Sequence, residues 1–285
     1  MKAFIIDRIA NSCDYIGGNR MKVYSLSGPS GTGKSTAALE VAYMHQIEGI
    51  IDDGLFIVNG QKCAGISAKF EKNSFTAVRR AIFQEQQHRT DVIEAIKDSG
   101  INSILVVGTS DKMTKQIASR LELGEIDTYI YVNDIRTAKE IRQAQFIRQM
   151  QGTHVMPIPH AQVEQNFFKR FVQKGRDIFL NKKKIGETTI VQPDFQQERI
   201  YIARLVYLHV LQHTLNHHKQ IAKYEVQNLQ VSTIPEMNIV IYLKSPVHYD
   251  VVNYLNQLQQ DIADTFLHHF GIEPERIDLQ LKGIK

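Results

Sequence analysis

A glycine-rich segment near the start of the chain constrains its fold more than any other feature. Residues Gly28–Ser35 read Gly-Pro-Ser-Gly-Thr-Gly-Lys-Ser and match the pattern G-x-x-x-x-G-K-S/T in full. Glycines let successive backbone N–H groups turn toward one anion, and a following helix adds the positive end of its dipole. In this pattern the lysine reaches the outer phosphates of a nucleotide, and the last hydroxyl ligates Mg²⁺.

The flanking residues supply the context that this pattern requires. Lys22–Ser27 predicts a short strand and Ser35–Met44 predicts a helix, so the segment lies between a strand and a helix. We therefore expect a nucleotide-phosphate loop that binds ATP, or alternatively GTP, together with Mg²⁺. The residues expected around the phosphates are Gly28, Pro29, Ser30, Gly31, Thr32, Gly33, Lys34, Ser35 and Thr36.

Composition places the chain among ordinary globular proteins. It has 285 residues, of which 43% are hydrophobic and 22% charged, and this length is where one core usually gives way to two domains. The net charge of +4 is too small to argue for nucleic-acid binding. No apolar run approaches the ~20 residues of a membrane span. Cys13 and Cys63 show no disulfide or metal spacing, so we expect a cytoplasmic protein.

Residues 1–163 predict an α/β domain. Apolar runs alternate with helical patterns, which favours a mostly parallel sheet with its ligand at the carboxyl ends of the strands. An Asn-Gly pair at 59–60 between two apolar runs predicts a hairpin. The expected elements after the loop are strands at Gly49–Asp53, Leu55–Val58, Lys62–Ile66, Ile104–Val107, Tyr129–Val132 and His154–Pro159, with helices at Ser74–Lys97 and Thr137–Met150.

Residues 164–186 differ from what precedes them. Phenylalanines and other apolar residues recur at helical spacing among lysines and arginines, and Lys182–Lys184 follows. This pattern predicts a basic amphipathic connector that docks its apolar stripe on the first domain. The alternative is contact of residues 167–184 with an anionic membrane surface.

Residues 187–285 predict a smaller α+β domain. Strands are expected at Arg199–Ile202, Tyr224–Val231, Asn238–Leu243 and Arg276–Leu281, with helices at Leu205–His218 and Tyr249–Phe270. The order is βαββαβ-like, which is typical of a two-layer sandwich with its helices on one face.

Turnover of a nucleotide also needs a carboxylate for Mg²⁺ and a group that positions the nucleophile. Asp52 and Asp53 lie at the end of an apolar run that follows the helix after the loop. We expect this helix to bring the chain back, so that the apolar run lies beside the first strand. Lys34, Asp52 and Asp53 are therefore the predicted catalytic residues, and Ser35 and Asp52 the predicted metal ligands. Asp111 and Asp134 are alternatives that suit helix capping or a turn at least as well.

Other charged residues and the histidines are less informative. A positively charged side chain is needed near the terminal phosphate. Several lysines and arginines qualify by residue type alone, and no choice among them follows from the sequence. Adjacent histidine pairs such as His217–His218 point to different sides of a helix and make poor joint metal ligands. The cationic candidates are Lys69, Arg79, Arg80, Arg136, Arg142 and Arg148.

The loop and the Asp-Asp pair at 52–53 together resemble the phosphate-loop kinases related to HPr kinase and phosphoenolpyruvate carboxykinase. The resemblance covers about residues 22–58 and lacks the later kinase signatures of that group. It implies that one aspartate acts as base on an acceptor or water and that the other helps to hold the metal. Ser27–Thr36 also looks like the opening of guanylate kinases, without their GMP-binding segment.

Residues from about 187 to the end resemble the alkaline-shock protein family of Gram-positive bacteria. The likeness rests on the pattern of 255–262 in the last predicted helix and on the close of the chain from His269 to Ile284. It implies a non-enzymatic domain for protein association, linked to envelope stress.

Together these observations favour a Mg²⁺-dependent ATP-binding protein, most simply an ATPase. Its nucleotide state would be coupled to a protein partner or to self-association through residues 187–285. One alternative is a kinase with Asp53 as base on a protein or small-molecule hydroxyl. Another is a nucleotide-gated scaffold in envelope stress that barely hydrolyses ATP.

Overall fold

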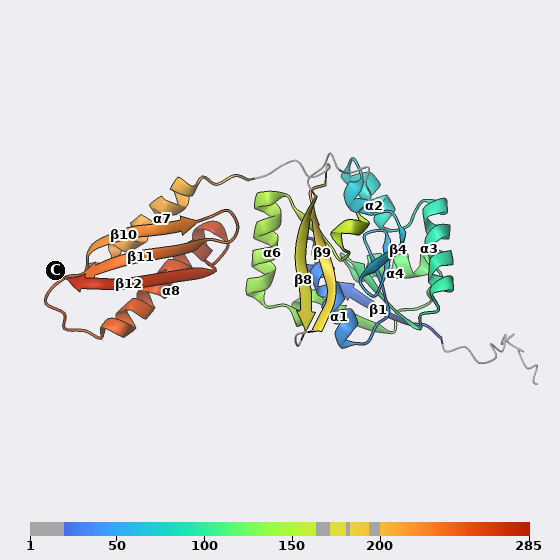
Figure 1. Cartoon of the computed structure of the whole chain (residues 1–285), viewed down its shortest axis with the longest axis horizontal. Coiled ribbons are helices and arrows are strands. Elements are labelled where there is room, and N and C mark those ends of the chain that lie inside the picture. The colour runs from blue at the N-terminus through green and yellow to red at the C-terminus, as the bar shows by residue number, and fades with distance from the viewer. Residues whose placement is uncertain (1–19, 164–171, 181–182, 194–199) are drawn as a thin grey trace, which may run out of the picture.

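The computed structural model describes residues 20–163, 172–180, 183–193 and 200–285, and its first domain is built on a six-stranded sheet (Figure 1). The strand order is β4-β3-β2-β5-β1-β6. Strands β1 (Lys22–Ser27), β2 (Gly49–Asp52), β5 (Ser103–Gly108) and β6 (Thr128–Tyr131) are parallel. Strands β3 (Leu55–Val58) and β4 (Gln61–Gly65) add an antiparallel hairpin, as the sequence predicts.

Helices cover both faces of this sheet. Successive residues of β1 point to opposite sides of the sheet, and Leu26 packs in the cluster of α1 (Lys34–Met44). Val23 packs in the cluster of α3 (Gln86–Ser99) and α4 (Asp111–Arg120) on the other side. Leu26 and Val23 are fully buried. The mixed α/β fold with a mostly parallel sheet therefore agrees with the prediction.

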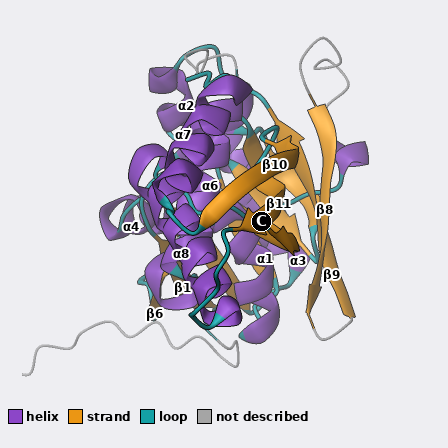
Figure 2. Cartoon of the chain, turned by 90° about the vertical axis from the view of Figure 1, so that its left-hand side faces the viewer, coloured by secondary structure: helices purple, strands orange, loops and turns teal. Residues whose placement is uncertain are grey.

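A second small sheet replaces the predicted connector helix. Residues 172–180 and 183–186 form strands and not a helix: β8 (Val172–Leu180) and β9 (Lys183–Val191) are antiparallel, and β9 also pairs with β7 (His154–Met156). Figure 2 shows β8 and β9 as a long two-stranded ribbon. Strand β9 runs across the predicted start of the second domain at residue 187. The first part of the predicted apolar stripe, at residues 167–171, lies outside the described residues.

The residues of β9 show why this part of the chain forms a strand and not a helix. Residues 188–191, Thr-Thr-Ile-Val, are all β-branched and favour a strand. Gly186 lets the strand approach α1 closely, because a Cβ there would lie 2.9 Å from Cδ1 of Leu39. Val191 and Ile178 join the α1 cluster, so the hairpin belongs to the core of the first domain.

The predicted long helix at 74–97 is two helices. α2 (Ser74–Ala81) ends before Phe83, a buried residue with a left-handed φ of 53°, and α3 starts at Gln86. The 3₁₀ helix η1 (Ala68–Phe70) precedes α2. This break matters because it turns the 66–85 segment back over the end of β2.

The C-terminal domain has the order α7-β10-β11-α8-β12. Helices α7 (Arg204–His217) and α8 (Val251–Phe270) share a core with the strands β10 (Ile221–Gln230), β11 (Glu236–Leu243) and β12 (Arg276–Ile284). β10 and β11 are antiparallel, and β11 and β12 are parallel across α8. The predicted strand at 199–202 is wrong for residues 200–202, which form none, so the βαββαβ order lacks its first strand in the described residues.

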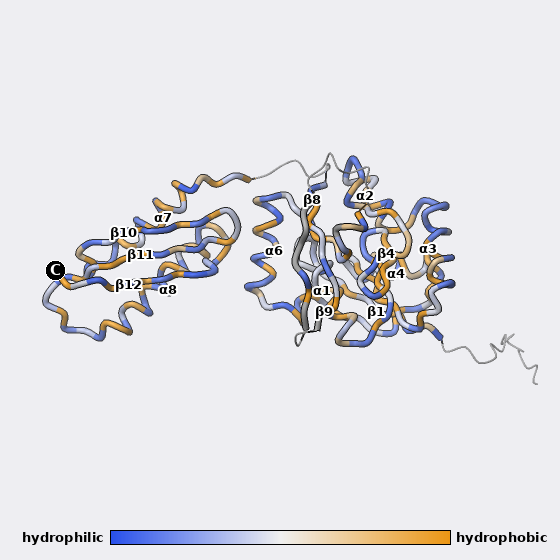
Figure 3. The backbone as a smooth tube through the Cα atoms, viewed as in Figure 1, coloured by the Kyte–Doolittle hydropathy of each residue, from blue (hydrophilic) through white to orange (hydrophobic). Residues whose placement is uncertain are grey.

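Helix α6 (Ala138–Gln151) lies between the two domains (Figure 1). Hydrophobic and hydrophilic residues alternate along it (Figure 3). Phe146 is 7% exposed and packs, with Met150, in the core cluster of the C-terminal domain. Thr137 and Glu140 form a reciprocal capping box that begins the helix. Helix α6 thus lies within the part of the sequence that forms the first domain, but its side chains also pack against the C-terminal domain.

Within the described part of the chain, no helix is both long enough and apolar enough to cross a membrane.

Candidate functional site

The glycine-rich loop that the sequence predicts to bind phosphate joins β1 to α1, in the geometry that its glycines allow. Gly31 and Gly33 have φ angles of 82° and 84°, in the left-handed region that other residues avoid. Gly33 is the N-cap of α1, and the helix begins at Lys34, so the positive end of its dipole faces the loop. No side chain caps this end. The first backbone N–H groups of α1 thus remain available to an anion.

Lys34 lies over the loop. Its Nζ donates hydrogen bonds to the carbonyl oxygens of Gly28 and Pro29, each at 2.7 Å. Burial lowers the pKa of Lys34 to about 8, although the charges of Asp52 and Asp53 act to raise it. A phosphate group would replace the two carbonyl contacts and would favour the charged form of the lysine.

The two predicted acidic residues end strand β2. Asp52 is the last residue of the strand and its side chain is 4% exposed, whereas the side chain of Asp53 is 37% exposed. Asp53 and Gly54 have φ angles of 46° and 88° and form the two-residue turn between β2 and β3. Asp is one of the few residues that tolerate this conformation, so Asp53 also has a role in the turn.

The expected position of β2 directly beside β1 is wrong. Strand β5 lies between them, since β2 and β1 each pair with β5. The aspartates nevertheless act on the loop, because their charges influence Lys34. The carboxyl ends of parallel strands share one edge of a sheet, and one intervening strand does not remove the aspartates from it.

Lys69 connects the aspartates to the loop. Its side chain is 5% exposed, and its Nζ lies 2.8 Å from Oδ2 of Asp53 and 3.7 Å from Oδ2 of Asp52. The same Nζ lies 3.4 Å from Oγ of Ser35. One buried ammonium group therefore brings together the three predicted oxygen donors from α1 and the β2 end.

Burial and charge set the ionisation of this cluster. Burial raises the pKa of Asp52, against the opposing effect of Lys69. Burial also acts to raise the pKa of Asp53, but the charge and hydrogen bond of Lys69 outweigh it and hold that pKa below its usual value. Burial acts to lower the pKa of Lys69, yet the two aspartates raise it. Asp53 is therefore a carboxylate and Lys69 an ammonium at neutral pH.

Arg148 approaches the loop from α6. A Cβ at Gly31 would lie 3.0 Å from Cδ of Arg148 and 3.8 Å from Cγ of Gln145, and a Cβ at Gly33 would lie 3.8 Å from Cβ of Ala144. Burial lowers the pKa of Arg148, and the charge of Asp53 acts to raise it. Of the six cationic candidates, the structure brings Lys69 and Arg148 to the site.

The alternative acids have other surroundings. Asp111 is the first residue of α4 and accepts hydrogen bonds from Oγ of Ser27, at 2.7 Å, and from the hydroxyl of Tyr131, at 3.0 Å. It therefore lies beside the residue that precedes the loop, with both carboxylate oxygens in use. Asp134 is exposed in the short helix α5 (Val132–Ile135).

The donor set fits Mg²⁺ by its chemistry. Ser35 supplies a hydroxyl and Asp52 a buried carboxylate, the oxygen ligands that this ion prefers. Oδ2 of Asp52 is buried and has no hydrogen-bond partner among the described residues. The described residues, this site included, contain no group of three or more His, Cys, Asp or Glu side chains that could hold a metal ion, so the fit depends on Ser35, Asp52 and the oxygens of a bound nucleotide.

Comparison with known proteins adds no name to this site. No model of a known protein family matches the chain. No curated protein matches it significantly either. The function is therefore inferred from the glycine-rich loop and from the side chains that surround it.

The sequence alone does not single out two residues of the site. Lys69 and Arg148 were indistinguishable by type from the other cations. One signal was present for Lys69: it stands between Ala68 and Phe70 and is the one charged residue from Cys63 to Phe70. A lysine that is buried almost always has a partner. No comparable signal distinguishes Arg148 on its helix.

Proposed function

We propose that this chain is a Mg²⁺-dependent ATP-binding protein that hydrolyses ATP. The observation that carries the proposal is the loop between β1 and α1, with Lys34 folded over it and Ser35 linked through Lys69 to two aspartates. Backbone N–H groups of the loop and the Lys34 ammonium would bind the phosphates. The loop reads phosphates, so GTP is the alternative nucleotide.

Ser35 and Asp52 would hold the metal ion, whose positive charge would offset the negative charge of the phosphates. Asp53 suits the remaining task. Its half-buried carboxylate is ionised and reaches solvent, so it can accept a hydrogen bond from water and orient it. Arg148 adds a cation on the side of the loop that faces α6.

The C-terminal domain would respond to the nucleotide through α6. One side of this helix contacts the loop through Arg148 and Gln145. Another side contacts the C-terminal domain through Phe146 and through the pair Arg142–Glu273. A shift of α6 on phosphate binding would therefore change its contacts with the C-terminal domain. We propose that this domain mediates self-association or binds a protein partner.

Incubation of the purified protein with Mg²⁺ and radiolabelled ATP or GTP tests the reaction. We expect release of phosphate that is lost in Asp53→Asn, while nucleotide binding persists. Asn keeps the left-handed conformation of the turn, so the change removes charge without straining the backbone. Lys34→Ala should weaken nucleotide binding about tenfold or more and should lose phosphate release.

Phosphate release by Asp53→Asn at the wild-type rate would overturn the role of Asp53. Transfer of the label to protein, without release of phosphate, would favour the kinase alternative. Size-exclusion chromatography with ATP and with ADP tests the coupling, because the proposal expects the oligomeric state to differ between them.

A further inference from the structure

The position of Lys69 raises a question about the cation in this site. Its Nζ contacts Ser35, Asp52 and Asp53 at distances of 3.4, 3.7 and 2.8 Å. Two of these residues are the proposed ligands of the metal ion, and the third is their neighbour. The lysine is almost completely buried, so solvent does not compete for its charge.

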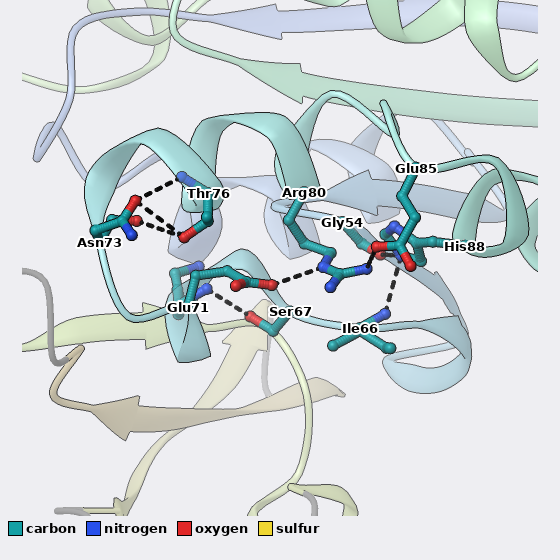
Figure 4. Close-up of polar contacts among 10 residues, drawn as sticks. Gly54, Ile66, Ser67, Glu71, Asn73, Thr76, Arg80, Glu85 and His88 are labelled. Atoms are coloured by element: carbon teal, nitrogen blue, oxygen red, sulfur yellow. Dashed lines mark hydrogen bonds and ion pairs between the residues drawn. The ribbon is translucent and has the colours of Figure 1, made fainter.

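The backbone around Lys69 is firmly held. The Ala68 N–H donates to the carbonyl of Asp53 at 2.7 Å, which ties η1 to the turn after β2. The Lys69 N–H donates to Oγ of Ser67 at 3.2 Å. Nearby, Arg80 pairs with Glu71 and Glu85 (Figure 4). The lysine is therefore delivered to the aspartates by a fixed segment, and its long side chain is the part that can move.

A metal ion and this ammonium cannot share the same oxygens. Mg²⁺ binds oxygen at about 2.0–2.1 Å in an octahedral shell. A second positive charge within hydrogen-bond distance of that shell would be repelled. Oδ2 of Asp52, buried and without a hydrogen bond in the described structure, is the atom that such an ion would gain.

The charge balance points the same way. Lys34, Lys69 and Arg148 bring three positive charges to a site with two aspartates. Without a ligand the site is thus already supplied with cations and attracts a polyphosphate more than a free divalent ion. A nucleotide supplies additional oxygens and negative charge, which changes that balance.

We propose that Lys69 is a tethered cation that occupies the metal position of the empty site and competes with divalent metal for Ser35, Asp52 and Asp53. Free metal is then excluded until a nucleotide brings it. The identity of the position as a metal site depends on the proposed function, but the competition is a property of the protein alone.

Binding of Mn²⁺ in the absence of nucleotide, followed by electron paramagnetic resonance of the free ion, tests this competition. Lys69→Met keeps the aliphatic stem and removes the charge. We expect it to bind Mn²⁺ about tenfold or more tightly than the wild type does. Lys72→Met, an exposed lysine three residues further on, is the matched control and should behave as the wild type.

The variant leaves two carboxylates without their cation, which destabilises the fold. Mn²⁺ should therefore raise the unfolding temperature of Lys69→Met more than that of the wild type. Lys69→Gln, which keeps a donor toward Asp53, is the second variant if the first does not fold. It is also expected to bind Mn²⁺ more tightly than the wild type.

Equal Mn²⁺ affinities in the wild type and the folded Lys69 variant would overturn the proposal. So would tight binding of Mn²⁺ by the wild type without nucleotide. Failure of the proposed function would give a different result, because the wild type would then not bind ATP. The Mn²⁺ comparison uses no nucleotide and would still decide whether Lys69 excludes the metal.

Discussion

Nη2 of Arg142 lies 3.0 Å from Oε1 of Glu273 and donates a hydrogen bond to it across the boundary between the two domains. Arg142 belongs to α6, which six residues later carries Arg148 to the phosphate loop. Six residues correspond to about 240° around an α-helix, so the two arginines point to different sides. One helix therefore contacts both the glycine-rich loop, which we propose binds the nucleotide, and the C-terminal domain.

Arg148→Ala should weaken ATP binding. Loss of a charged donor near the phosphates costs about 1.5–3 kcal/mol, which corresponds to about a tenfold or greater rise in the dissociation constant. Isothermal titration calorimetry measures the dissociation constant, with Arg79→Ala, an exposed arginine on α2, as the control. Equal affinities of Arg148→Ala and the wild type would exclude a phosphate contact for Arg148.

Gly31→Ala and Gly100→Ala separate backbone strain from crowding of the loop. Both glycines have left-handed φ angles, so each alanine costs about 1–2 kcal/mol of stability. A Cβ at Gly31 meets Arg148, whereas a Cβ at Gly100 meets nothing within 4 Å. We expect only Gly31→Ala to lower ATP affinity in the same calorimetric experiment. A similar loss in Gly100→Ala would show that strain far from the site is enough.

Phe146→Ala should loosen the contact of α6 with the C-terminal domain. The side chain is 7% exposed, and truncation of a core phenylalanine costs about 3–5 kcal/mol. Phe75, 70% exposed on α2, is the control, and its truncation should change stability by less than about 0.5 kcal/mol. Urea unfolding followed by circular dichroism compares them. Equal unfolding midpoints of the two variants would contradict the packing described here.

The pH dependence of ATP binding should report Lys34. Burial holds its pKa at about 8 in the free protein, and a bound phosphate favours the charged form. Above about pH 8 binding must therefore be coupled to uptake of a proton, and the dissociation constant should rise by up to about tenfold per pH unit. Calorimetric titrations at pH 7, 8 and 9 measure the slope. A constant affinity over this range would contradict a buried, charged Lys34 at the phosphates.

The sequence is sufficient where the local structure depends on neighbouring residues. The loop from Gly28 to Ser35 and the Asn59–Gly60 hairpin are local patterns, and both occur in the predicted places. The β8–β9 hairpin was misread because apolar spacing at 167–179 imitates a helix. Its strands are instead stabilised by pairing with β7 and by contact with α1, which no local pattern reveals.

The cations of the site illustrate the same limit. Lys69 lies 34 residues after Ser35, and Arg148 lies 117 residues after Gly31, so only the packed structure brings them together. The order of the strands is a second case. Nothing between Asp53 and Ser103 indicates that β5 will insert between β1 and β2. Tertiary contacts decide such positions, and one sequence does not contain them in local form.

Equilibrium binding of ATP to the wild type and to Lys34→Ala, in the presence of Mg²⁺, tests directly whether the glycine-rich loop binds a nucleotide. We predict saturable binding of one ATP per chain by the wild type. We also predict an affinity about tenfold or more lower for Lys34→Ala, because a charged contact to the phosphates is lost. No saturable binding of ATP or GTP by the wild type, or the same affinity in the variant, would contradict nucleotide binding at this loop.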